Sequence, residues 1–158
     1  MLGDAPHYNA SPLIPLLVVT GLSSYGLYLC YQNIMRLQIY EEQAQKAAKW
    51  SNTAAKRLNK TRATQTSGTI ALGISAFTAV LLILTKLSVT PHVVLSGIGG
   101  VASVLAQIHM KSFWNEKEQV QVPLMGKFNQ AVRGSEEVVQ LLGGIAAAWV
   151  AAGLLAFF

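Results

Sequence analysis

Charged residues are scarce in this chain. Only 12% of its 158 residues are Asp, Glu, Lys or Arg, whereas soluble domains usually carry about 25%. Because 52% of the residues are hydrophobic, this shortage excludes an ordinary soluble domain and indicates lipid as the main solvent. Acidic residues are the scarcer kind, with 7 against 12 basic residues and a net charge of +5. No nucleic-acid-binding motif accompanies this surplus, so we expect no nucleic-acid partner.

Cysteine, histidine and catalytic motifs are also nearly absent. The one cysteine, Cys30, excludes a disulfide framework within the chain. Of the three histidines, His7 and His92 are expected on the lumenal side of the membrane and His109 on the other side, so we expect no metal site. The sequence has no Walker loop, no HExxH run and no recognisable Ser/His/Asp arrangement, and we therefore expect no cofactor.

Long apolar runs are what the chain has instead. Residues 67–84 form eighteen consecutive positions without an ionisable side chain, close to the roughly 20 that a membrane-spanning helix needs. Three similar runs occur elsewhere. We therefore expect an all-α membrane protein in which a short tail, 1–12, precedes one four-helix domain, 13–158. The spans are expected at about 13–31, 67–85, 89–109 and 138–157, as an antiparallel bundle.

The segment 32–66 carries most of the basic charge. It holds seven Lys and Arg residues against Glu41 and Glu42, and it contains no proline or glycine. Its alanines recur at helical spacing around Trp50. We expect the first helix to extend into a basic amphipathic arm, which either lies on an anionic leaflet through 36–62 or is a solvated connector.

Charge asymmetry predicts the orientation in the membrane. The connectors 32–66 and 110–137 hold 7 and 4 basic residues, together 11 of the 12. The positive-inside rule places both connectors in the cytosol and both termini on the other side. An endomembrane of the endoplasmic-reticulum type is expected, with the mitochondrial inner membrane as the alternative.

Small residues line two of the predicted spans. Membrane helices approach closely where side chains are small, so these positions predict contacts with other membrane helices, in a homo-oligomer or a complex. They are Ser96, Gly99, Gly100 and Ser103 in the third span, and Gly144, Ala148 and Ala152 in the fourth.

Polar residues gather at the predicted cytosolic helix ends. The catalytic candidates are His109, Arg133 and Glu137, and the ligand-binding candidates are Asn59, Arg62 and Gln107. Histidine has a pKa suited to general acid–base work, and polar groups at a membrane boundary can bind an amphipathic ligand. The alternative is that these are ordinary interfacial residues, with Gln107 hydrogen-bonded to a neighbouring helix through Thr78 or Ser75.

Two outline resemblances concern short motifs. The pair Arg62-Ala63 resembles the first two residues of the second-helix run in the membrane-associated eicosanoid and glutathione metabolism family, but the rest of that run is missing. Val132-Arg133 followed by 141–143 is similar to the pattern before the last helix of anthrone-oxygenase-like proteins, whose Pro-x-Asn segment is absent. These departures leave no functional residue to carry over.

The absence of motifs favours a non-catalytic role. We expect a helix-packing accessory, scaffold or assembly component of a membrane. The alternative is a membrane-embedded enzyme acting on a lipophilic small molecule, in lipid or secondary metabolism, with its site at the cytosolic helix ends. A transporter is the weakest interpretation, because no ionisable residue lies in the middle of a span.

Overall fold

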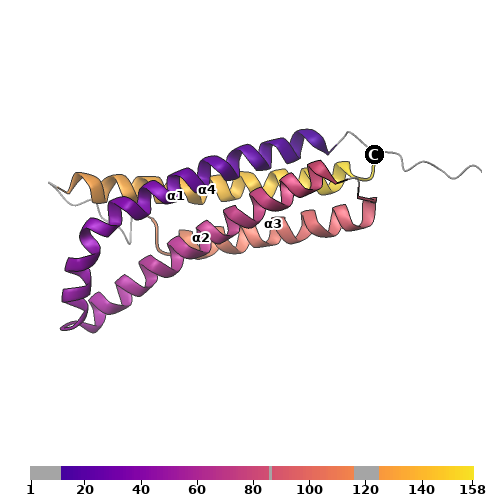
Figure 1. Ribbon diagram of the computed structural model, residues 1–158. Helices are drawn as coiled ribbons and strands as arrows, with labels where there is room; N and C mark the ends of the chain where they lie inside the picture. The colour runs from indigo at the N-terminus through magenta and orange to yellow at the C-terminus, as the bar shows by residue number, and fades with distance from the viewer. Residues whose placement is uncertain (1–11, 86, 116–124) are drawn as a thin grey trace, which may run out of the picture.

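A computed structural model describes residues 12–85, 87–115 and 125–158, and this part of the chain forms four helices and no strand. The helices are α1 (Leu13–Ala48), α2 (Asn52–Leu84), α3 (Val89–Lys111) and α4 (Gly126–Leu155) (Figure 1). Each is long and apolar enough to cross a membrane. The expected all-α fold with four candidate spans is confirmed.

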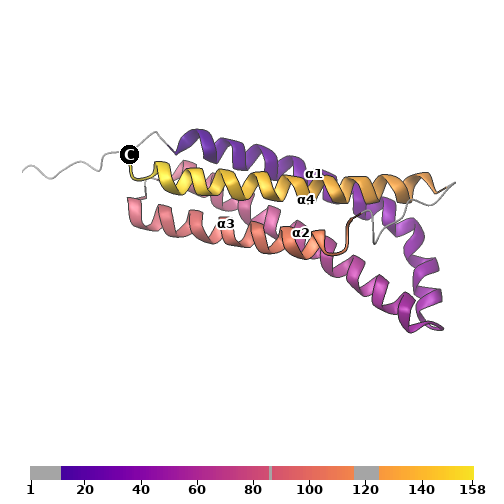
Figure 2. The same ribbon diagram turned by 180° about the vertical axis from the view of Figure 1, so that it is seen from behind.

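The helices form an antiparallel bundle in which chain neighbours pack side by side. α1 contacts α2 and α4, and α3 also contacts α2 and α4. Only a small α2–α4 contact crosses the bundle, and α1 and α3 do not touch in the described structure. Figure 2 shows α4 running alongside both α1 and α3. α3 is therefore held from two sides and leaves a broad outer face uncovered.

The two ends of the bundle differ because α1 and α2 are longer than a membrane crossing requires. At 1.5 Å per residue, the 36 residues of α1 and the 33 of α2 reach about 54 and 50 Å, well beyond a hydrocarbon core of about 30 Å. The excess lies at one end, where α1 and α2 project together from the bundle (Figure 1). This is the arm predicted from the sequence.

The arm is a helical hairpin with a turn that the sequence analysis did not predict. α1 ends at Ala48, and α2 begins at Asn52 after a short turn that exposes Trp50 by 91%. The Ser51 hydroxyl accepts a hydrogen bond from the Ala54 N–H at 3.4 Å, which caps the first turn of α2. The basic segment therefore runs outward along α1 and returns along α2.

A fully buried packing contact joins α4 to α3. The Trp149 side chain is completely buried, and a Cβ added at Gly99 would lie 2.5 Å from its indole ring. The indole N–H donates to the Ser75 hydroxyl of α2 at 3.2 Å. The ring fits because Gly99 has no side chain, so one glycine fixes how α3 sits on α4.

The other predicted packing residues differ in burial. Ser96, Gly100 and Ser103 are buried with Gly99 on the inner side of α3. Ala152 is buried and Ala148 half-buried, whereas Gly144 is exposed beside Leu22 of α1. A contact of these residues with a partner helix remains a prediction.

The substitution Gly99→Ala is expected to lower the free energy of unfolding by about 1–3 kcal/mol, because its methyl group overlaps the buried Trp149 ring. Gly97→Ala is the matched control, since a Cβ there meets nothing within 4 Å. Cys30 is the single cysteine and is fully buried. Its reaction with a thiol-reactive dye during heating in detergent reports unfolding. Equal shifts for both variants would contradict the proposed fit.

Candidate functional site

A pocket of about 280 Å³ lies where the arm leaves the bundle. Its walls come from α1, α2, the start of α4 and the residues that follow α3. The lining residues are Leu37, Tyr40, Glu41, Ala44, Ala54, Arg57, Leu58, Thr61, Arg62, Phe113 and Phe128. We call this cavity the arm pocket.

Aromatic rings build the inner wall of the arm pocket. Tyr40 of α1 and Phe128 of α4 meet edge to face, with ring centroids 6.0 Å apart. Phe113 packs in the same manner against Trp114, at 5.1 Å. The Lys60 ammonium lies 5.5 Å from the Phe113 ring centroid, within cation–π range. The wall is therefore apolar, with cationic groups at its edge.

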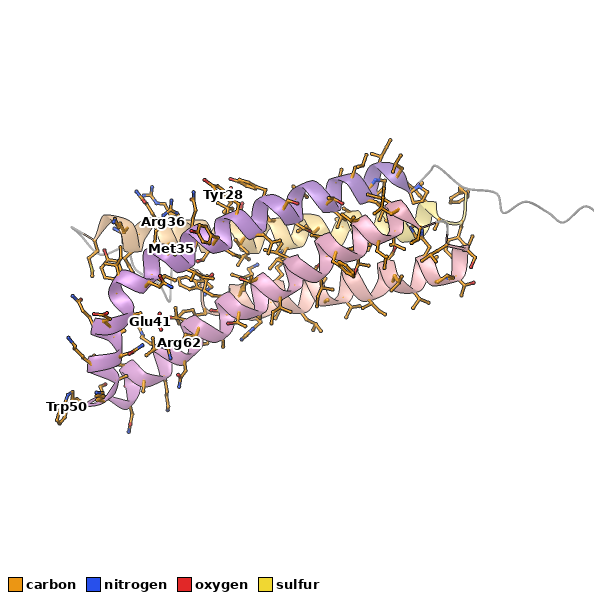
Figure 3. The ribbon with its side chains drawn as sticks, viewed as in Figure 1. Tyr28, Met35, Arg36, Glu41, Trp50 and Arg62 are labelled. Carbon is orange, nitrogen blue, oxygen red and sulfur yellow. The ribbon has the colours of Figure 1, made fainter. Side chains whose placement is uncertain are left out.

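Charged groups form the rim of the arm pocket. The Arg62 guanidinium donates from Nε to Glu41 Oε1 at 2.8 Å and also contacts that oxygen through Nη2. Figure 3 shows the two side chains pointing toward each other between the helices of the arm. Both are partly exposed, at 49% and 32%, so the pair contributes no more than about 1 kcal/mol to stability. Its main effect is to link α1 to α2 across the pocket mouth.

Buried polar groups lie just inside the bundle from the arm pocket. The Trp114 indole N–H donates to the Thr64 hydroxyl at 2.9 Å, and the Gln65 amide donates to the Ser135 hydroxyl at 2.7 Å. These bonds tie α2 to α4 and to the segment after α3. They provide polar contacts between elements where the bundle begins to open.

Asn33 is the exception in this layer. Its side chain is fully buried, and neither amide atom has a hydrogen-bond partner in the described structure. Gln65 Oε1 is also unpaired. A buried polar group without a partner costs about 1–3 kcal/mol. An Asn at this position therefore reduces stability instead of adding to it.

The sequence analysis did not identify Asn33, although a signal was present. Gly26, Cys30 and Asn33 follow one another at i, i+4 and i+7, and all three are buried. That spacing places them on one face of a helix. The face packs against Leu72 of α2 at Gly26 and against α4 at Asn33, where a Cβ added at Gly134 would lie 2.9 Å from Asn33 Cγ.

The catalytic candidates are not gathered in one pocket. His109 is exposed, with Nδ1 2.9 Å from the Ser67 hydroxyl. Glu137 is exposed and accepts a hydrogen bond from the Tyr25 hydroxyl at 2.8 Å. Arg133 is exposed on α4. None of these three residues lines the arm pocket.

The ligand-binding candidates have three different settings. Arg62 lines the arm pocket, whereas Asn59 is exposed on α2 outside it. The Gln107 amide donates to the Val139 carbonyl of α4 at 3.2 Å. The expected bond to a neighbouring helix is therefore present, but its predicted acceptors, Thr78 and Ser75, are wrong. Gly143 leaves room for this amide, since a Cβ there would lie 2.5 Å from Gln107 Nε2.

The chemistry of the arm pocket follows from its apolar walls and charged rim. Among the described residues, no three His, Cys, Asp or Glu side chains lie close enough together to hold a metal ion. In the arm pocket, the Thr61 hydroxyl donates to the Arg57 carbonyl and Glu41 is held by Arg62. Apolar walls with a cationic rim are the chemistry of a pocket for an amphipathic molecule.

The four candidate spans define the class of protein. The chain is a multi-pass integral membrane protein with four candidate spans. Comparisons with known protein families, with curated protein sequences and with solved structures find no match. Neither outline resemblance therefore gains support.

The contact between Gly134 and Asn33 can be tested with a double-mutant cycle. Gly134→Ala is expected to lower the free energy of unfolding by about 1–3 kcal/mol, because the buried Asn33 amide has little room to move. In an Asn33→Ala background, the same substitution should cost less than about 0.5 kcal/mol. The stability of all four proteins of the cycle is measured by thermal unfolding, followed by the dye reaction of Cys30. Additive effects would show that the two positions do not interact.

Proposed function

We propose that the protein is a non-catalytic component of a membrane complex, which docks one transmembrane helix of a partner protein between α3 and α4. The observation that carries this proposal is an apolar groove of about 590 Å³ along these two helices. Its lining residues are Val93, Ser96, Gly97, Gly100, Val101, Val104, Leu105, Ala146, Ala147, Trp149, Val150, Gly153, Leu154 and Phe157. We call it the α3–α4 groove.

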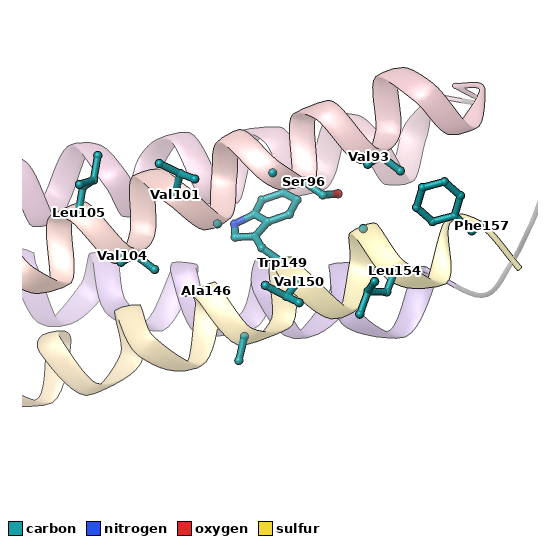
Figure 4. A pocket seen from close by; sticks show the side chains of 14 residues that line it. Val93, Ser96, Val101, Val104, Leu105, Ala146, Trp149, Val150, Leu154 and Phe157 are labelled. Atoms are coloured by element: carbon teal, nitrogen blue, oxygen red, sulfur yellow. The ribbon is translucent and has the colours of Figure 1, made fainter.

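The α3–α4 groove has the size and surface of a helix contact. From Val93 to Leu105 it follows α3 for about 18 Å, more than half of a hydrocarbon core of about 30 Å. Figure 4 shows the Trp149 ring between the two helices, with valines and leucines along the sides. Helices in lipid associate by van der Waals packing against such surfaces.

Gly97 is the residue that favours a helix as the occupant. It lies in the middle of α3, and a Cβ at this position would meet nothing within 4 Å. Glycine inside a helix is less stable than alanine by about 0.5–1 kcal/mol, and the bundle itself does not need the missing side chain here. A neighbouring helix backbone could approach closely only if position 97 has no side chain, whereas a flexible lipid chain would pack equally well against alanine.

The shape of the α3–α4 groove argues against a symmetric pair of these chains. A two-fold contact sets the same surface against itself. Two concave grooves facing each other would enclose empty space, so the occupant has to be a convex partner. A foreign transmembrane helix meets this requirement.

A membrane-embedded enzyme is the second candidate function. The arm pocket supports it as a place for a lipophilic substrate, at the helix ends that the charge distribution assigns to the cytosol. The lining residues, however, offer no nucleophile paired with a base, and His109 and Arg133 lie outside the pocket. The geometry therefore supports the accessory role better.

Photo-crosslinking tests the docking proposal. A photoreactive amino acid at Val101, 60% exposed within the α3–α4 groove, is expected to crosslink a discrete membrane protein in native membranes. The control position is Ile74 of α2, 48% exposed and outside the groove, which should crosslink lipid. Only lipid adducts at Val101, or an adduct with a second copy of this chain, would contradict the proposal.

A steric substitution provides an independent measurement. Gly97→Leu is expected to reduce the Val101 adduct at least about ten-fold, because the leucine side chain blocks the approach of the partner helix. Thermal unfolding, followed by the dye reaction of Cys30, should stay unchanged. Gly73→Leu on α2 is the matched control, since a Cβ there also meets nothing within 4 Å. Equal loss of the adduct in both variants would show that the groove does not determine the contact.

A further inference from the structure

The arm pocket begins at the outer edge of the lipid headgroup layer. The apolar part of α1 ends near residue 31, and the first pocket residue, Leu37, follows six residues later, about 9 Å further along the helix. The headgroup layer extends roughly 5–7 Å beyond the hydrocarbon core on each side. The pocket therefore starts where this layer meets water.

The lining of the arm pocket has two chemically distinct parts. Leu37, Phe113 and Phe128 provide apolar walls, and the Arg57 and Arg62 guanidinium groups lie at the rim. Guanidinium groups bind phosphate through two parallel hydrogen bonds. An apolar cavity with such a rim matches a molecule with a hydrocarbon body and an anionic head.

Arg57 is the residue available for an anion. Its guanidinium has no hydrogen bond or ion pair to another described residue, whereas Arg62 is held by Glu41. An anion at the rim would therefore meet one uncommitted guanidinium, with Arg62 and the Lys60 ammonium nearby. The pairing of Arg62 with Glu41 keeps the two helices of the arm together around it.

We propose that the arm pocket binds a phosphate-bearing amphiphile, with the phosphate on Arg57 and the first part of the hydrocarbon chain between Phe113 and Phe128. A volume of about 280 Å³ holds about nine groups of water size, so the pocket takes the upper part of such a molecule and leaves the rest outside. This site is separate from the α3–α4 groove. The two proposals can therefore fail independently.

Binding of dodecyl phosphate to the full chain in a neutral maltoside detergent tests the proposal. Arg57→Gln is expected to weaken binding about ten-fold or more, because a charge-assisted hydrogen bond is lost. Lys56→Gln removes the same charge from the neighbouring residue, which is exposed and does not line the pocket. It should weaken binding less than about two-fold. Equal losses would mean diffuse attraction to a basic arm and would overturn the proposal.

The apolar half of the site needs its own variant. Phe128→Ala is expected to weaken dodecyl phosphate binding about ten-fold while leaving the weak binding of inorganic phosphate unchanged. If inorganic phosphate binds as tightly as dodecyl phosphate, the pocket holds only an anion and the proposal is wrong. Unfolding at Cys30 identifies any variant that fails to fold, and Phe128→Leu then replaces Phe128→Ala.

Two kinds of nanodisc distinguish the sources of the amphiphile. If phosphatidic acid in the disc blocks added dodecyl phosphate and phosphatidylcholine does not, the occupant is an anionic lipid of the surrounding leaflet. If neither disc blocks it, the occupant is a soluble amphiphile that enters from the water side. Either outcome supports the phosphate site, whereas the absence of binding both in the discs and in detergent overturns it.

Discussion

The fit of the Trp149 indole over Gly99 is the contact on which the bundle most depends. In lipid, helices gain little from hydrophobic burial against one another, so close packing and a few hydrogen bonds have to hold them. Trp149 supplies both, because its ring fills the space above Gly99 of α3 and its N–H bonds to Ser75 of α2. One side chain of α4 thereby sets the positions of two other helices. α1 depends on different contacts, with Gly26 against Leu72 and Asn33 against Gly134.

This arrangement explains why the two candidate surfaces lie where they do. Trp149 joins α3 to α4 from the inside, and the small residues around it leave the outer side of the same seam hollow as the α3–α4 groove. At the far end, α1 and α2 continue past the end of α3 and leave the bundle together, while the first turns of α4 lie beside them. The space between the arm and the start of α4 is filled by aromatic rings only in part, and the arm pocket remains.

The sequence predicted what depends on local composition. Hydropathy and charge predicted the four apolar helices and the basic arm, because both signals are carried by neighbouring residues. They did not predict the turn at 49–51, which contains no glycine or proline. Nor did they show that α4 begins at Gly126, twelve residues before the expected span at 138. The early turns of α4 pack beside the arm through Phe128 and Tyr40, so hydropathy alone gives no indication of them.

Pairing between helices was harder to predict, because it depends on the register of distant residues. Gln107 illustrates this: a polar residue within a span predicts an interhelical hydrogen bond, but its acceptor is a backbone carbonyl of α4, which no side-chain pattern marks. Asn33 is the reverse case, a buried amide that lacks a partner and opposes stability. Residues retained against stability commonly serve function. Asn33 is therefore a position where a buried polar group opposes folding, whereas Trp149 both holds the bundle together and lines the α3–α4 groove.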